Sequence, residues 1–166
     1  MEGPAWTDQP GGEADRAIAA LYYAHYRTLA RIVALLLGNG EVAEEVVQDA
    51  FVAMACAWRQ LRDGDEALRY LRRGVITRTR ARGATSAGLP GRRAPGLTDT
   101  GLGAVLLDLP VRQREALVLK FYAGWPDAQI ASAMGISRRT ADACIRHGMA
   151  ALQARLGPGG GAPGPA

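Results

Sequence analysis

The chain has 166 residues, enough for one domain or two small ones, and its 48% hydrophobic content excludes a wholly disordered protein. No apolar run approaches the ~20 residues that a membrane-spanning helix needs, so we expect no membrane insertion. The N-terminus carries Glu2, Asp8 and Glu13 where an export signal has a basic region and an apolar stretch. We therefore expect a cytoplasmic protein.

The net charge of +4 is unevenly distributed along the chain. Residues 1–60 contain 4 basic and 8 acidic groups, residues 61–96 contain 9 and 3, and residues 97–166 contain 7 and 5. An acidic segment followed by an arginine-rich one indicates two kinds of partner, a basic protein surface and a polyanion.

Metal binding and catalysis are not expected. Cys56 and Cys144 lie too far apart for a CxxC pair, and only His25 and His147 are available to join them in a metal site. The sequence shows no grouping of nucleophile, base and oxyanion donors. We expect neither a cofactor nor an enzyme.

Helical spacing of apolar residues predicts three helices within residues 15–82, beginning with one over Asp15–Leu37 that Gly38-Asn39-Gly40 ends. The second starts at Glu41 and the third runs from Glu66 to about Arg82. The predicted inward positions of the three helices are Ile18, Tyr22, Leu29, Ile32 and Leu36, then Val47, Phe51, Met54, Trp58 and Leu61, then Leu68, Leu71 and Val75.

Residues 83–101 contain five glycines and two prolines without apolar periodicity, which predicts a linker. Residues 1–14 and 157–166 are predicted to be disordered. A second helical unit is expected over 102–156, with Leu117, Val118 and Phe121 facing inward in a helix from Val111 to Tyr122. The predicted fold is therefore all-α, with two small domains joined by a flexible linker.

The last two predicted helices, Asp127 to Met134 and Arg138 to about Leu156, form a helix-turn-helix pattern. Gly135 suits the tight turn, and Ser137 is a natural N-cap for the second helix. Such a helix can place its first residues in a major groove. The alternative is a packed helical hairpin with solvated charges.

Two charged arrays remain. Six arginines fall within residues 69–82 with Tyr70 among them, which is typical of a surface that binds phosphates and stacks an unpaired base. The alternative is a solvated helix face with Tyr70 in the core.

The second array is acidic. Glu41, Glu45 and Asp49 are spaced by four residues and repel one another, and a basic partner would offset the energetic cost of that repulsion. Ordinary solvation is the alternative here too.

At these residues the chain resembles the extracytoplasmic-function (ECF) subfamily of the sigma-70 family of bacterial RNA polymerase sigma factors, of the actinobacterial type. Ala43–Phe51 and Ala57–Arg59 look like sigma region 2, and Leu109–Glu115 through Gly148–Leu152 look like region 4. The resemblance implies a promoter-specificity factor with region 2 at 15–82 and region 4 at 102–156. The alternative is a helix-turn-helix regulator, or a degenerate sigma factor acting through a protein partner.

The resemblance also implies partners and site residues. Core RNA polymerase, through its beta-prime clamp helices and beta flap, and promoter DNA are the implied partners, and an anti-sigma factor is a further candidate. The implied clamp-binding residues are Glu44, Glu45, Gln48 and Asp49. The implied minus-ten residues are Trp58, Arg69, Tyr70, Arg73, Thr77 and Arg80. The implied minus-thirty-five residues are Ser137, Arg138, Arg139, Thr140, Asp142 and Arg146.

The chain departs from the family pattern at both DNA-binding sites. Thr77 stands where many relatives have a base-contacting Asn, which predicts altered minus-ten readout. Thr140–Cys144 replaces the common Thr-Val-Lys-Ser-Arg, so two cations are lost and Asp142 is gained. We expect weak or unusual contact with the minus-thirty-five element.

Overall fold

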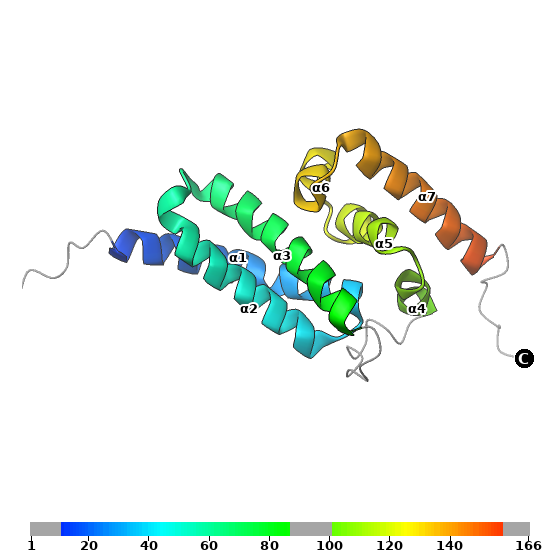
Figure 1. Cartoon of the computed structure of the whole chain (residues 1–166), viewed down its shortest axis with the longest axis horizontal. Coiled ribbons are helices and arrows are strands. Elements are labelled where there is room, and N and C mark those ends of the chain that lie inside the picture. Colours follow the sequence, from blue (N-terminus) through cyan, green and yellow to red (C-terminus); the bar gives the residue numbers. More distant parts are fainter. Residues whose placement is uncertain (1–10, 87–100, 158–166) are drawn as a thin grey trace, which may run out of the picture.

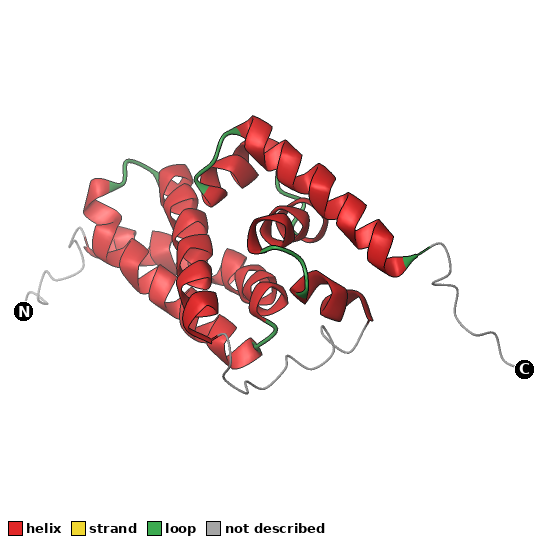
Figure 2. Ribbon diagram, turned by 45° about the vertical axis from the view of Figure 1, so that its right-hand side comes forward, coloured by secondary structure: helices red, strands yellow, loops and turns green. Residues whose placement is uncertain are grey.

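The computed structural model describes residues 11–86 and 101–157, and within these ranges every regular element is a helix (Figure 2). The helices form two groups that lie side by side (Figure 1). The N-terminal half contains α1 (Gly11–Leu37), α2 (Gly40–Ala57), the 3₁₀ turn η1 (Trp58–Gln60) and α3 (Gly64–Ser86). The C-terminal half contains α4 (Gly101–Leu107), α5 (Val111–Leu117), the π-helical turn η2 (Val118–Tyr122), α6 (Asp127–Met134) and α7 (Arg138–Leu156). The all-α prediction is confirmed.

The N-terminal half is built on the apolar stripes of its three long helices, each of which packs against the other two. The fully buried side chains at its centre include Ile32, Val47, Met54, Leu71 and Val75. Burial of each such side chain contributes about 2 kcal/mol, so the predicted inward stripes are what hold α1, α2 and α3 together.

The turns between these helices depend on specific caps. Gly38 takes the predicted left-handed conformation, with φ +69°. Asn39 is extended instead, and its side-chain oxygen accepts hydrogen bonds from the amides of Glu41 and Val42, which makes it the N-cap of α2. Before α3, the amide of Glu66 donates to the carboxylate of Asp63 at 2.7 Å, so α3 begins at Gly64, earlier than predicted.

In the C-terminal half, α5 and α7 approach closely because Gly148 has no side chain. A Cβ there would lie 3.0 Å from the side chain of Leu117. The prediction that Phe121 faces inward is wrong, since its side chain is 62% exposed. The π-helical turn η2 accounts for the difference: its wider turn breaks the 3.6-residue periodicity, and Leu119 becomes fully buried.

Two predicted boundaries are also wrong. Residues 11–14, expected to be disordered, form the first turn of α1, and residues 83–86, assigned to the linker, extend α3. At Gly83, α3 still runs beside α1, since the position of a Cβ there is within van der Waals contact, 3.5 Å, of the side chain of Leu37. The rest of the predicted disordered ends and linker, residues 1–10, 87–100 and 158–166, lies outside the described residues.

The two halves contact one another directly. Helix α3 packs against α6, and α1 packs against α4 and η2. Buried side chains of both halves form one continuous cluster that includes Val33, Leu71, Trp125 and Ile130. The halves are therefore packed together in the free chain. The division into domains at 15–82 and 102–156 stays a prediction.

Candidate protein and nucleic-acid interfaces

Four side chains that the sequence assigned to a protein partner lie together on one exposed side of α2: Glu44, Glu45, Gln48 and Asp49. We call them the acidic surface. Glu45 accepts a hydrogen bond from Arg82 of α3 at 3.0 Å, with both side chains substantially exposed. Exposed pairs of this kind contribute between about 0 and 1 kcal/mol, so Glu45 remains available to a partner.

An aromatic cluster beside the acidic surface was not predicted. Tyr22 stacks on Tyr26 with ring centroids 4.6 Å apart and meets Phe51 edge-on at 5.1 Å. Burial raises the pKa of Tyr26, and a hydrogen bond with Gln48 opposes that rise. Tyr22 is 37% exposed and Tyr23 86% exposed, so the predicted inward position of Tyr22 is wrong. Helical periodicity alone could not reveal this, because Tyr22 falls on the apolar stripe but near the edge of the core.

Along α3, the side chains of Arg69, Tyr70, Arg73 and Thr77 are exposed. Tyr70 is 40% exposed, which excludes the alternative that it lies in the core. Trp58, assigned with them to the minus-ten element, is half-buried in η1, where it lines a pocket with Ile18 of α1. The structure therefore presents four of the six assigned side chains on the surface of one helix.

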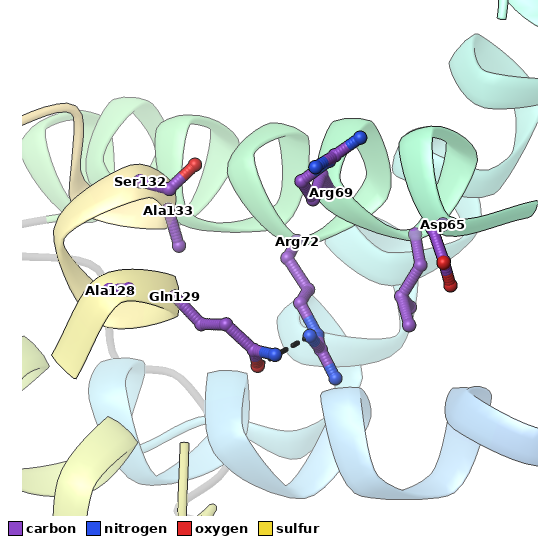
Figure 3. A pocket seen from close by; sticks show the side chains of 8 residues that line it. Asp65, Arg69, Arg72, Ala128, Gln129, Ser132 and Ala133 are labelled. Atoms are coloured by element: carbon purple, nitrogen blue, oxygen red, sulfur yellow. Dashed lines mark hydrogen bonds between the residues drawn. The ribbon is translucent and has the colours of Figure 1, made fainter. Parts of the chain in front are cut away.

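A cleft of about 500 Å³ separates part of α3 from α6, and Arg72 lies within it (Figure 3). Its guanidinium donates to the side-chain oxygen of Gln129 at 2.6 Å and lies 4.7 Å from the ring centroid of Trp125. Burial lowers the pKa of Arg72. One of the six arginines within residues 69–82 therefore contacts side chains of the C-terminal half.

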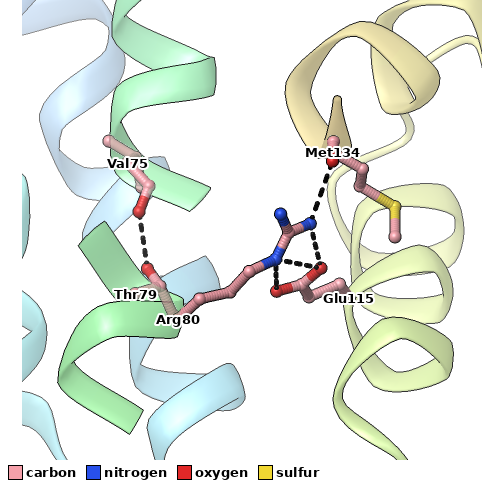
Figure 4. A network of polar contacts seen from close by, with 5 residues as sticks. All are labelled: Val75, Thr79, Arg80, Glu115 and Met134. Atoms are coloured by element: carbon pink, nitrogen blue, oxygen red, sulfur yellow. Dashed lines mark hydrogen bonds and ion pairs between the residues drawn. The ribbon is translucent and has the colours of Figure 1, made fainter. Parts of the chain in front are cut away.

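Arg80 is engaged more tightly (Figure 4). Its Nε donates to both carboxylate oxygens of Glu115 at 2.7 and 3.0 Å, and its Nη2 donates to Oε2 at 2.6 Å and to the carbonyl of Met134 at 3.2 Å. Glu115 is 1% exposed. Arg80 was assigned to minus-ten DNA from sequence, yet here it is half-buried against α5 and α6. The sequence held no signal for this pair, whose members are 35 residues apart.

A third arginine, Arg114 of α5, links the halves because its side chain donates to backbone carbonyls in both of them. It donates to the carbonyl of Leu36 in α1 at 2.6 Å and to those of Leu107 and Leu109 at 2.8 and 3.1 Å. Burial lowers the pKa of this guanidinium. Leu36 and Leu107 lie at the ends of α1 and α4, where the backbone lacks intrahelical partners, and Leu109 lies in the turn after α4. Arg114 therefore caps two helices and the turn that follows one of them.

The predicted helix-turn-helix is present as α6, a turn and α7. Gly135 is left-handed with φ +65°, and the hydroxyl of Ser137 caps α7 by accepting from the amide of Thr140 at 3.1 Å. At the start of α7, Arg138, Arg139 and Thr140 are exposed. One turn further, Asp142 accepts from Nε of Arg146 at 3.1 Å, and both side chains are well exposed. All six residues assigned to the minus-thirty-five element are therefore exposed, at the cap and along the first three turns of α7.

An apolar groove of about 520 Å³ lies between α4, η2 and α7. Its lining includes Leu106, Leu117, Phe121 and Leu152. The groove was not predicted, because it depends on the outward turn of Phe121 that η2 produces. It offers a second surface suited to an apolar protein segment.

Residues 11–86 and 101–157 hold no group of three or more His, Cys, Asp or Glu side chains that could bind a metal ion. Nor do these ranges contain a helix both long and apolar enough to cross a membrane.

Comparison with protein families gives two matches in the order expected from sequence. Residues 21–85 match the profile of sigma-70 region 2, and residues 101–152 match that of sigma-70 region 4. A curated relative from Mycobacterium tuberculosis, the ECF RNA polymerase sigma factor SigL, is 27% identical over 157 residues, covering 82% of this chain and 87% of the relative.

Solved structures with the same fold include CnrH in complex with the cytosolic domain of CnrY, with a TM-score of 0.72 and 24% identity over 87% of this chain and 93% of that one. The sigma factor RpoE in complex with the anti-sigma factor NepR from Bartonella quintana gives a TM-score of 0.63 and 19% identity, over 83% of this chain and 95% of that one. The two-part helical architecture is therefore shared with these proteins.

Proposed function

Because the chain belongs to the ECF group of the sigma-70 family of RNA polymerase sigma factors, we propose that α2 binds core polymerase while α3 and α7 bind the promoter minus-ten and minus-thirty-five elements. We place this function in the cytoplasm, where RNA polymerase binds promoters. The observation that carries it is the occurrence, in one chain, of an acidic protein-binding surface and two separate arginine-bearing helices.

Core polymerase binding rests on the acidic surface and its aromatic border. Glu44, Gln48 and Asp49 are exposed on α2 in a segment where like charges repel. A basic partner such as the beta-prime clamp helices relieves that repulsion. Tyr23 adds a large exposed ring nearby on α1, and aromatic side chains are enriched among the residues that contribute most to protein interfaces.

Minus-ten binding rests on the exposed face of α3. Arg69 and Arg73 are one turn apart and suit successive phosphates of a DNA strand. Tyr70 lies beside them with enough exposed ring to stack on an unpaired base. Thr77, on the same face, offers only a hydroxyl where relatives carry an amide, so it supplies fewer contacts to a base edge.

Minus-thirty-five binding rests on the first two turns of α7. Arg138 and Arg139 lie at the capped end of the helix, the end that a recognition helix inserts into the major groove. The pairing of Arg146 through Nε leaves its two terminal nitrogens free for a guanine edge or a phosphate. Asp142 thereby orients Arg146 and also repels phosphate, which makes contact with this element selective but weak.

The apolar groove beside α7 is the proposed site for an apolar protein segment, such as the polymerase beta flap. The two structural neighbours, CnrH with CnrY and RpoE with the anti-sigma factor NepR, are both complexes with a second protein. We extend this to the present chain: an anti-sigma factor that fills the groove would compete with the flap. A groove of this size and apolarity is large enough for side chains of a helix.

The test is a charge reversal in the acidic surface. The double variant Glu45→Lys and Asp49→Lys should lose binding to a beta-prime clamp-helix fragment, because both side chains are exposed and would then repel the basic partner. Circular dichroism of the same sample should stay helical. The matched control is Asp65→Lys, an exposed acidic position at the start of α3, which should bind like the parent chain.

Unchanged affinity in the folded double variant would contradict clamp binding. It would favour the second candidate function, a helix-turn-helix regulator or a degenerate sigma factor that acts through another protein. A regulator of that kind has no need of the acidic surface, whereas a promoter-specificity factor requires it.

A further inference from the structure

Gly74 lies in the middle of α3, one turn after Tyr70 and one turn before Arg78. Glycine inside a helix is less favourable than alanine, and Gly74 has no positive φ that would require it. Among the described residues, one atom outside the α3 backbone and the neighbouring residues lies within 4 Å of the position of its Cβ. That atom is Nη1 of Arg78, at 3.0 Å. The missing side chain therefore makes room for the Arg78 guanidinium.

The guanidinium of Arg78 is positioned on the helix backbone. Its Nη1 donates to the carbonyl oxygen of Gly74 at 3.2 Å, and this is its one side-chain hydrogen bond within residues 11–86 and 101–157. The buried side-chain polar atoms without a partner in these ranges belong to Gln113 and Arg114. Nε and Nη2 of the half-buried Arg78 are therefore reached by solvent, and the guanidinium has one anchored nitrogen and one open edge.

Arg78 differs in this respect from the other half-buried arginines of α3. Arg72, Arg80 and Arg82 each donate to a side-chain oxygen elsewhere in the fold. The partner of Arg78 is a neutral carbonyl of its own helix, so no carboxylate of the described residues pairs with its charge. Both the charge and the Nε–Nη2 edge of Arg78 are available to a ligand.

Tyr70 lies on the other side of Gly74. Helix residues four apart share a face, with Cβ atoms about 5–6 Å apart, and their side chains lean toward the helix N-terminus. Arg78 therefore reaches back over Gly74, and the ring of Tyr70, which is 40% exposed, lies beyond it. We call Tyr70, Gly74 and Arg78 the α3 notch. It presents an aromatic ring, bare backbone and a guanidinium edge in that order along the helix.

We propose that the α3 notch binds one unpaired base with a preference for guanine, an inference that rests on the proposed minus-ten role of α3. The base stacks on Tyr70, since aromatic side chains hold the bases of single-stranded DNA in this way. Nε and Nη2 of Arg78 donate to O6 and N7, the acceptor pair that arginine recognises on guanine. Adenine has an amino group in place of O6, so it opposes a donor to a donor. Arg78 is thus a specificity-determining residue and Gly74 its positioning residue.

A side chain at position 74 would disturb the notch in two ways. A Cβ would lie too close to Nη1 of Arg78, so the guanidinium would leave the backbone carbonyl. The same Cβ would also occupy the floor on which the base lies. Gly74→Ala should therefore raise stability through the better helix propensity of alanine and at the same time lose base recognition. A glycine with a purely structural role would not give these opposite effects.

The test uses the chain assembled with bacterial core polymerase. Two fluorescent 12-nucleotide thymine strands are compared, one with a central guanine and one with a central adenine. The parent complex should favour the guanine strand at least about fivefold more than core polymerase alone does. Gly74→Ala and Arg78→Lys should each reduce the guanine-to-adenine ratio to that of core polymerase alone. Lysine keeps the charge of Arg78 without its planar fork, so this variant separates base recognition from phosphate binding.

The matched control is Gly83→Ala, the same substitution at another position of α3. A Cβ there meets the side chain of Leu37 at 3.5 Å, an ordinary contact, and lies away from Arg78. Urea unfolding of the full-length chain should show both glycine variants to be at least as stable as the parent. Gly83→Ala should keep the parent's guanine-to-adenine ratio.

A parent ratio equal to that of core polymerase alone would overturn the proposal. So would an unchanged ratio in both Gly74→Ala and Arg78→Lys, including the case in which Arg78→Lys binds both strands more weakly to the same extent. The underlying function is tested separately by Arg73→Ala and Tyr70→Ala. If both of these variants bind both strands as tightly as the parent, the minus-ten role of α3 itself is refuted.

Discussion

The arginines buried between the two halves and those at the start of α7 have the same side-chain chemistry and opposite surroundings. Arg80 and Arg114 are half-buried, and each donates to several oxygens of the C-terminal half or of helix ends. Arg138 and Arg139 are exposed and make no ion pair within the described part of the chain. Arginine-rich sequence therefore does not by itself identify the cations that are free for DNA.

The largest effect on stability is expected for a buried arginine, Arg114. Arg114→Ala removes three charge-assisted hydrogen bonds and leaves the carbonyls of Leu36, Leu107 and Leu109 without this partner. The free energy of unfolding should fall by about 3 kcal/mol. Urea unfolding followed by circular dichroism measures it. Arg112→Ala, at an exposed position two residues earlier, should change it by less than about 0.5 kcal/mol. Equal effects would contradict the capping role.

For the exposed Arg139, the Arg139→Ala variant should keep the stability of the parent chain. It should bind minus-thirty-five duplex DNA about fivefold more weakly, or by ~1 kcal/mol. The slope of log affinity against log salt should decrease by about one, because one phosphate contact is lost. Anisotropy titrations at several salt concentrations measure both quantities. A loss of stability without a change in salt slope would place Arg139 among the structural arginines instead.

Arg146 is intermediate, since it is exposed but paired with Asp142. Asp142→Lys should tighten minus-thirty-five binding, because it removes an anion near phosphate and restores the cation typical of the family. The expected gain is a few-fold, below the effect at Arg139. Footprinting on the native promoter is the measurement. If recognition is lost, Asp142 reads a base directly, for example by accepting from a cytosine amino group.

The smallest expected effect is a pH dependence of stability at His25 of α1. Burial lowers the pKa of His25 from 6.5, and the nearby positive charge of Arg72 lowers it further. The folded chain therefore binds this proton less readily than the unfolded chain does. Stability should be unaffected above about pH 6.5 and should decrease as the pH falls below it. Urea midpoints at about pH 7.5 and about pH 5.5 test this. His25→Gln should reduce the difference; an undiminished difference would assign it to other groups.

Much of the local structure was predictable from sequence. Helices α6 and α7 begin and end where Pro126, Gly135 and Ser137 indicated, because these residues act through their own backbone preferences and caps. The charge pattern of α2 and the arginine content of α3 were also evident from sequence, and the resemblance to the family supplied the assigned residues. In each case the signal lies within a few residues of the feature that it predicts.

The features missed from sequence depend on long-range contacts or on broken periodicity. Arg72 and Gln129 are 57 residues apart, and Arg114 and Leu36 are 78 apart. No pattern among neighbouring residues predicts either contact. The π-helical turn rotates Phe121 outward after a segment of ordinary helical spacing. A single sequence read with a 3.6-residue period places that ring inside.

Run-off transcription with purified bacterial core polymerase over a promoter library tests the central claim most directly. The claim is that this sigma factor selects promoters through both DNA-binding helices while α2 holds the polymerase. The parent chain should yield transcripts from templates that share minus-ten and minus-thirty-five sequences, and the Glu45→Lys and Asp49→Lys double variant should yield none. Transcripts that do not depend on template sequence, or no transcripts from a chain that still binds the clamp fragment, would contradict it.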